Sequence, residues 1–372
     1  MSFSHPKAYW IAFSRVRGIG AVRLTRLWET FGDLEQAWNA PAEELKDAGL
    51  GPQTLAALLR EREQLDPDAE ARRIEDLGFR VLTWDDEDYP VRLREITQPP
   101  PVLYLWGQLA PQDKWSTAVV GTRQPTAYGQ AVARDLAAAL AANGITVVSG
   151  LARGIDTVAH RAALEAGGRT LAVLGSGLDQ IYPPEHEKLG QEIVKNGAIL
   201  TEYPLGTRPE PGNFPPRNRI ISGLALAVVI VEAGEGSGAL ITADFAADQG
   251  REVFAVPGPI FNRASKGTNR LIKAGARPLT APEDVLEVLN MDVIARYETA
   301  SEELPEDDTE RRVLEALSSD PLHVDDLRAR VGLPVSEINA SLTMLELKGR
   351  ARQVGAMQYV RVREARADYR VD

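Results

Sequence analysis

One segment of the 372-residue chain combines an aromatic ring with cationic side chains. In PEPGNFPPRNRIISGLA, Phe214 stands among prolines, and Arg217, Asn218 and Arg219 follow at an expected helix start. A ring can stack on an unpaired base, which contributes roughly 1–3 kcal/mol, while guanidinium groups bind phosphates. We expect Asn218 to cap or order this loop rather than to read a base. The segment predicts a single-stranded nucleic-acid site, and the alternative is that Phe214 only covers the core beneath a loop.

Small residues recur wherever an apolar run ends, in GTR, SGLARGID, GSGLDQIYP and EAGEGSGALIT. Such residues before a helix let the backbone approach an anion, and exposed N–H groups with the helix dipole attract it. The candidate contacts are Gly121, Arg123, Ser149, Gly150, Arg153, Gly154, Gly175, Ser176, Gly177, Ser237 and Gly238. For Arg123 and Arg153 the alternative is surface ion pairing with helix carboxylates. With TEYP after the fourth run, five such loops on one edge would suit a polyanion or a nucleotide.

The elements that must position these residues lie between residues 116 and 280. Six apolar runs alternate with helical stretches that end in glycine: STAVVG, ITVVSG, RTLAVLG, AILTEY, LAVVIVEA and EVFAVPG. Short runs rich in Val, Ile and Leu are typical of parallel strands buried on both faces. The pattern predicts an α/β fold with a Rossmann-like, doubly wound and mostly parallel sheet, whose ligands bind at the carboxyl ends of the strands.

Four segments are expected along the chain. Residues 1–65 predict a small helical domain of the SAM-like or helix-hairpin-helix kind, since Gly18, Gly20, Gly49 and Gly51 mark tight turns. Its turns could hold a DNA phosphate, or they could simply close a packing domain. Residues 66–288 form the extended Rossmann-like domain, with added strands near Val81–Trp84 and Val102–Trp106. Residues 289–308 read as an acidic linker, and 309–372 as a winged helix.

The winged helix is expected to be a packing or protein-contact module rather than a reader of duplex DNA. Its third helix offers Ser336, Glu337, Asn339, Thr343 and Glu346, with Lys348 only at its end. A helix that reads base edges normally carries Arg, Lys, Asn or Gln toward the groove.

Composition excludes several classes of function. The chain has no cysteine, so a disulfide framework, a thiolate metal site and a cysteine nucleophile are absent, and its four histidines are scattered. No apolar run approaches the ~18 residues of a membrane span, and no signal peptide is evident, so a cytoplasmic location is expected. The net charge is −11, yet residues 115–280 carry 16 Lys and Arg against 14 Asp and Glu. A local basic face on the central domain is therefore compatible with the total.

An ordered set of motifs resembles the DNA-processing protein A family (DprA, also called Smf). GTR, SGLARGID with Ala159 and His160, LGSGLDQIYP, TEYP, FPPRNRIISGL, VEA, SGALITA, VPG and SKGTNRLIKAGA follow one another over about 160 residues. The resemblance implies a non-enzymatic recombination mediator, without a cofactor or metal. It would hold single-stranded DNA in a basic pocket of the Rossmann-like domain, form homodimers and load a RecA-type recombinase in natural transformation or DNA repair. By the same resemblance the pocket would include Arg123, Phe214, Arg217 and Arg219, with the backbone of Gly175–Gly177 and Ser237–Gly238.

Two other functions remain open. The fold also resembles nucleotide phosphoribohydrolases of the lysine-decarboxylase-like group, in which Asp156 and Glu232 would be the catalytic acids and EGSGALIT the phosphate loop. The simpler interpretation is that Asp156 orders its helix start and Glu232 pairs with an arginine. No GxxxxGK[ST] sequence occurs, which argues against ATP hydrolysis by that route. The second alternative is a scaffold whose basic stretch 263–277 contacts a partner protein.

Overall fold

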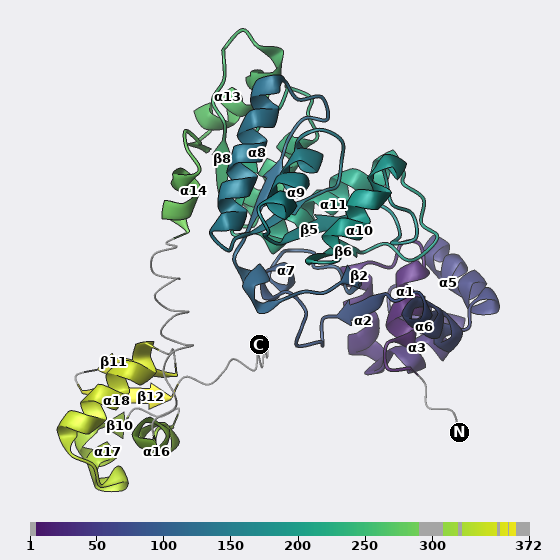
Figure 1. Cartoon of the computed structure of the whole chain (residues 1–372). Coiled ribbons are helices and arrows are strands. Elements are labelled where there is room, and N and C mark those ends of the chain that lie inside the picture. The colour runs from purple at the N-terminus through teal and green to yellow at the C-terminus, as the bar shows by residue number, and fades with distance from the viewer. Residues whose placement is uncertain (1–4, 290–307, 319–321, 348–349, 356, 362–372) are drawn as a thin grey trace. The chain divides into compact units, whose positions relative to one another are not determined.

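The computed structural model describes residues 5–289, 308–318, 322–347, 350–355 and 357–361. The chain divides into two compact units, one up to Val285 and one from Leu286, and each is described by itself (Figure 1). The predicted acidic linker falls almost entirely outside the described residues.

The first unit begins with short helices. These are α1 (Ala8–Arg15), α2 (Ala21–Phe31), α3 (Leu34–Asn39), α4 (Ala42–Asp47), α5 (Pro52–Gln64) and α6 (Pro67–Asp76). Their starts follow ordinary helix chemistry: the Asp66 carboxylate accepts the Ala69 N–H at 3.0 Å, and Pro67 occupies the first helical position. Their apolar faces meet around Phe13, Leu27 and Leu58, all fully buried. Helices this short depend on such packing for their stability.

A nine-stranded sheet forms the centre of the first unit. Its strands are β1 (Arg80–Thr83), β2 (Val102–Gly107), β3 (Ser116–Val120), β4 (Thr146–Ser149), β5 (Thr170–Val173), β6 (Gly197–Thr201), β7 (Ala227–Ile230), β8 (Glu252–Ala255) and β9 (Arg277–Pro278). They lie in the order β1-β2-β6-β5-β4-β3-β7-β8-β9. The pairs β1–β2 and β2–β6 are antiparallel and all the others are parallel. The six predicted strands and the two added ones are thus confirmed, as is the Rossmann-like fold.

Helices cover both faces of the sheet (Figure 1). They are α7 (Val91–Arg94), α8 (Ala127–Ala142), α9 (Ile155–Glu165), α10 (Glu187–Ile193), α11 (Phe214–Leu224), α12 (Ala239–Asp248) and α13 (Lys266–Lys273). A further short helix, α14 (Glu283–Val288), follows β9. Along β5, Leu171 and Val173 join the core that includes α11 and α12, whereas Ala172 joins the core that includes α10. Successive side chains of a strand point to opposite faces, so β5 is buried on both.

The N-terminal helices share a core with one face of the sheet. Trp10 of α1 contacts Trp84 edge to face, at 6.0 Å between ring centroids, and the Ser14 and Tyr104 hydroxyls hydrogen-bond at 2.7 Å. Tyr104 and Ala172 belong to the same apolar cluster as Phe13. The domain boundary expected at residue 65 therefore stays a prediction.

The second unit contains the predicted winged-helix elements. They are α16 (Asp308–Ala316), β10 (Leu322–His323), α17 (Val324–Val331), α18 (Val335–Leu347), β11 (Ala351–Gly355) and β12 (Gln358–Arg361). The three strands lie in the order β10-β12-β11, beside a core that contains Val313, Leu327, Ile338 and Leu342. Because Ile338 and Leu342 are four residues apart, they lie on one face of α18 and bury it. Ser336, Glu337 and Thr343 of α18 are exposed.

Candidate functional site

A pocket of about 790 Å³ opens where the carboxyl ends of β3 and β7 meet. This is the point where the strand order reverses, since the chain leaves β3 toward β4 on one side and reaches β7 on the other. The wall includes Gly121, Arg123, Phe214, Arg217, Asn218, Ser237 and Gly238. Seven of the fifteen predicted contacts therefore lie around one cavity. Ser237 and Gly238 stand at the start of α12, where the helix dipole gives a positive potential.

Phe214 is the centre of a cluster of rings and cations. The guanidinium carbon of Arg123 lies 5.5 Å from the centroid of its ring, that of Arg217 lies 5.8 Å away, and the Tyr182 ring is at 5.8 Å. Cations at these distances are attracted to the face of a ring. Phe214 is half-buried and is the first residue of α11, followed by two prolines that suit the first turn. The ring is thus held in place while part of it remains accessible.

The two arginines of this cluster differ in what else they contact. Arg123 is exposed and has no hydrogen bond or ion pair within the part of the chain described. Arg217 is only 4% exposed, and its Nη1 donates to the Gly150 carbonyl at 2.7 Å and to the Val173 carbonyl. Burial lowers the pKa of Arg217 to about 10, although the nearby Asp156 favours its charged form. Arg217 therefore joins the ends of β4 and β5 beneath Phe214, and Arg123 is the cation that faces solvent.

The loop between β4 and α9 is held in a strained conformation. Leu151 is buried and has a φ of 54°, which is a left-handed backbone conformation. This conformation is energetically unfavourable for any residue that carries a side chain. His186 Nδ1 donates to the Leu151 carbonyl at 2.9 Å, and the Asp156 carboxylate accepts the Gly150 and Ala152 N–H groups at 3.0 and 3.4 Å. These bonds fix the loop from both sides.

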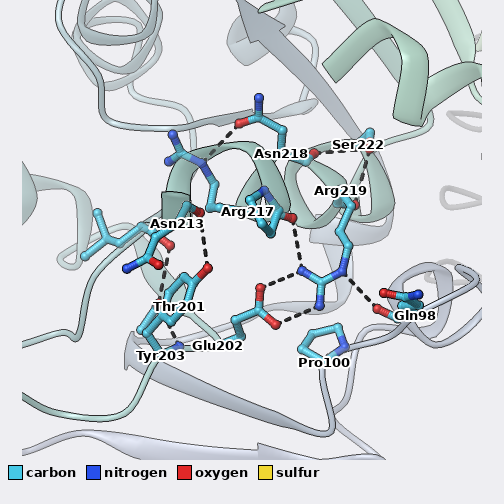
Figure 2. A network of polar contacts seen from close by, with 12 residues as sticks. Gln98, Pro100, Thr201, Glu202, Tyr203, Asn213, Arg217, Asn218, Arg219 and Ser222 are labelled. Carbon is cyan, nitrogen blue, oxygen red and sulfur yellow. Dashed lines mark hydrogen bonds and ion pairs between the residues drawn. The ribbon is translucent and has the colours of Figure 1, made fainter. Parts of the chain in front are cut away.

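Arg217 and Arg219 leave α11 on different sides (Figure 2). Arg219 forms a two-pronged ion pair with Glu202, with Nη1 and Nη2 at 2.5 and 2.7 Å from the carboxylate oxygens, and its Nε donates to the Gln98 carbonyl. Burial acts against the charge of Arg219, but the bonds to Glu202 outweigh it and raise its pKa. Arg219 thus lines a different cavity from Arg123.

Asn218 does not cap the helix, because α11 begins four residues earlier, at Phe214. Its Nδ2 donates to the Gly238 carbonyl at 3.2 Å, and its Oδ1 accepts from Arg217 Nε at 3.3 Å. Asn218 therefore joins α11 to the loop before α12.

Other predicted contacts support the pocket from outside its wall. Ser149 and Ser176 are buried, and their hydroxyls donate to the Val119 and Gln180 carbonyls. Gly175 packs closely under Phe214: a Cβ there would lie 3.0 Å from the ring. Arg153 forms the surface ion pair considered above, with Nε 2.6 Å from Glu185 Oε1. At Gly154 and Gly177 the backbone passes close to the backbone of another loop.

The two carboxylates of the enzyme hypothesis are both engaged. Asp156 orders the loop before its helix, as expected, and burial raises its pKa. Glu232 was expected to pair with an arginine, which is wrong. Its two oxygens accept the Thr126 N–H at 2.8 Å and the Thr126 hydroxyl at 2.5 Å, so it anchors the start of α8 instead. Among the described residues no group of His, Cys, Asp and Glu is arranged to hold a metal ion.

Sequence reasoning missed several residues that line the pocket. Thr122, Gln124 and Thr242 lie on its wall, as do Pro209 and Pro211 from the segment after β6. Tyr182, also on the wall, stands in the GSGLDQIYP loop, where an aromatic residue near a strand end was the available signal.

Comparison with known proteins agrees with this fold. A family model described as DNA recombination-mediator protein A matches residues 80–290, and one described as the DprA winged helix domain matches residues 298–357. Protein Smf of Synechocystis sp. is 38% identical over 392 positions, covering 95% of this chain and 98% of that protein. Protein Smf of Escherichia coli is 40% identical over 78% of this chain and 80% of its own length.

Two solved structures are also similar. DNA processing protein A from Streptococcus pneumoniae matches with a TM-score of 0.66 and 34% identity, over 77% of this chain and 98% of that one. DNA processing protein A from Helicobacter pylori, solved to describe its single-stranded DNA binding mode, matches with a TM-score of 0.52 and 33% identity, over 57% of this chain and 96% of that one.

Fold, winged helix and relatives define the class: a DNA-processing protein built on a Rossmann-like sheet. Within that class, the chain belongs to the DNA recombination-mediator protein A family, DprA or Smf. The resemblance stated from the motifs is confirmed. No helix in the described ranges has both the length and the apolar character needed to cross a membrane.

Proposed function

We propose that this protein binds single-stranded DNA at the Arg123–Phe214 pocket and loads a RecA-type recombinase onto it, without catalysing a reaction. One observation carries the proposal: an exposed arginine without an ion-pair partner lies over a partly accessible phenyl ring, at the switch point of a parallel sheet. Stacking and phosphate neutralisation are the two interactions that bind a single strand with little sequence preference. The relative from Helicobacter pylori, described for its single-stranded DNA binding, supports the same role.

The remaining parts of the proposal rest on the family. A homodimer in the cytoplasm would present the DNA-bound pockets to the recombinase, in transformation or in repair. We assign the predicted contacts two roles. Arg123, Phe214 and the backbone at Ser237 and Gly238 touch the strand, whereas Arg217, Asn218, Ser149 and Ser176 hold those groups in place. No catalytic role is proposed for Asp156 or Glu232, and release of free base from nucleoside monophosphates would contradict that assignment.

The test is fluorescence anisotropy with labelled oligothymidine across a salt series. Arg123→Ala should make the slope of log affinity against log salt shallower by about 0.7, because one phosphate contact is lost. Arg134→Ala is the matched control, since Arg134 is exposed on α8 and lines neither cavity. An unchanged slope in Arg123→Ala would remove Arg123 from the binding site.

Phe214→Ala should weaken binding by roughly 1–3 kcal/mol and leave the salt slope unchanged, because stacking releases no counterions. Phe214→Tyr retains the ring and is expected to retain most of the affinity. Wild-type protein that ignores oligothymidine at low salt would overturn the proposed function as a whole.

A further inference from the structure

A second and larger cavity, of about 1380 Å³, lies in the same unit between the N-terminal helices and the sheet domain. One wall is the glycine turn from Arg17 to Gly20 with the start of α2, and the other is the chain after β6 with the start of α11. We call this cavity the arginine groove. The DNA-binding proposal above does not use it.

Arginines dominate the charge of the arginine groove. Its lining includes Arg15, Arg17, Arg23, Arg26, Arg208 and Arg219 against only two carboxylates, Glu202 and Glu210. By comparison, the charged side chains that line the Arg123–Phe214 pocket are Arg123, Arg217 and the buried Asp156. The N-terminal arginines are also concentrated in sequence, because residues 15–28 hold four arginines and no acid.

Part of this charge is neutralised within the protein. Arg15 pairs with Glu61 at 2.8 Å and Glu70 at 2.9 Å, and Arg219 pairs with Glu202. Arg23 donates to the Gly18 carbonyl. Arg17, Arg26 and Arg208, by contrast, are exposed and have no hydrogen bond or ion pair from their side chains to any described residue. Three guanidinium groups from two walls of one groove thus remain available to an anion, against the single exposed carboxylate of Glu210.

The arginine groove adjoins the first pocket. Pro215 lines both cavities, with Phe214 and Arg217 on one side of it and Asn213 and Arg219 on the other. Figure 2 shows how α11 sends Arg217 and Arg219 in different directions, which places one on each cavity. A strand stacked on Phe214 has only to cross Pro215 to enter the groove.

We propose that the arginine groove binds the continuation of the single strand held at Phe214, with Arg17, Arg26 and Arg208 on its phosphates. The inference rests on the proposed function and extends it: the helical N-terminal part adds length and charge to one DNA path. A polynucleotide fits better than a folded partner because the free groups are guanidiniums spaced along a groove that continues from a stacking site. The half-buried Tyr203, whose hydroxyl donates to the Asn213 carbonyl, gives the groove a ring of its own.

The experiment compares a short oligothymidine of about six nucleotides with one of about twenty, bound to the full chain. In the variant Arg17→Ala, Arg26→Ala, Arg208→Ala, affinity for the short strand should stay at the wild-type value. Affinity for the long strand should fall roughly 100-fold near 0.1 M salt, and its salt slope should become shallower by about 2, since three contacts are lost at about 0.7 each. All three residues are exposed, so the melting temperature should not change.

The matched control removes three other exposed arginines that line neither cavity, as Arg60→Ala, Arg134→Ala, Arg161→Ala. It changes the net charge equally and should leave both affinities near wild type. The proposal is overturned if the groove variant binds the long strand as this control does, or if wild type binds both strands equally tightly. If the groove variant loses binding to polyglutamate but keeps wild-type DNA binding, the groove binds an acidic protein segment instead. Failure of wild type to bind either strand is a separate outcome, which overturns the proposed function itself.

Discussion

Arg217 shows how a buried cation can serve a binding site without touching its ligand. Its guanidinium holds the Gly150 and Val173 carbonyls, lies near Asp156 and supports the ring of Phe214. Arg217→Ala should therefore destabilise the fold by roughly 3 kcal/mol or more, because two buried hydrogen bonds from a charged donor are lost, each contributing roughly 1.5–3 kcal/mol. The free energy of unfolding in urea measures this loss.

Arg217→Lys tests whether Arg217 supports the ring of Phe214 or binds phosphate itself. It retains a charge but not the planar, multiply donating head of arginine. We expect weaker oligothymidine binding, since Phe214 loses its support, with the salt slope of the wild type. If the slope instead becomes shallower, as predicted for Arg123→Ala, Arg217 contacts phosphate and the structural assignment is wrong.

His160 makes stability depend on pH. It is fully buried, and because the Thr170 hydroxyl donates to the Val147 carbonyl, His160 Nδ1 must donate to Thr170. Its Nε2 has no partner within the described structure. Burial, with His186 and Arg217 nearby, lowers the pKa of His160 to about 3. The unfolded chain takes up a proton near pH 6.5 and the folded chain does not, so stability should fall as pH drops from 6.5 toward 3.

The loss attributable to His160 approaches about 1.4 kcal/mol per pH unit below pH 6. His160→Leu should remove that share, so the wild-type and variant unfolding curves converge as pH falls from 8 to 5. Parallel curves over this range would show that His160 does not titrate on unfolding.

At the scale of elements, the site depends on how closely two loops approach. Gly154 has a φ of 83°, and a Cβ there would lie 2.3 Å from the Thr122 carbonyl oxygen and within 2.8 Å of the Arg123 backbone. Gly154→Ala should therefore displace the loop that carries Arg123, and it should lower both stability and DNA affinity.

Gly144→Ala is the control for Gly154→Ala. Gly144 also has a positive φ, at 73°, but an added Cβ there meets nothing within 4 Å. Only the backbone cost of roughly 1–2 kcal/mol is expected, with DNA affinity unchanged. Equal effects of the two substitutions on affinity would contradict the role given to the close approach.

Strand–helix alternation carried most of the information about the fold. Runs such as LAVVIVEA are apolar on both faces, which identified the buried parallel strands, and the topology rules placed their carboxyl ends on one edge. The division of labour among arginines could not be predicted, because it depends on burial. Arg123, Arg217 and Arg219 look alike in sequence, yet one is exposed, one holds backbone carbonyls and one is neutralised by Glu202. Glu232 was misassigned for the same reason: its partner Thr126 lies 106 residues away.

At the scale of the whole molecule, the two units have separate apolar cores. Phe13, Tyr104 and Ala172 belong to one cluster of the first unit, and Val313 with Leu327 to the cluster of the second. Calorimetry should therefore resolve two unfolding transitions. The helix α18, Val335–Leu347, has no Lys or Arg in its sequence, which argues against a DNA contact by the winged helix.

Oligothymidine should accordingly stabilise only the first unit, and it should raise the temperature of only that unit's unfolding transition. Ligand at about 100 times its Kd adds about 2.7 kcal/mol to the unit that binds it, because it binds the folded state alone. In Phe214→Ala the same concentration should produce a smaller shift, whereas the second transition should be unaffected in either protein. A shift of both transitions would mean that the winged helix also binds DNA. The path proposed through the arginine groove would then be incomplete.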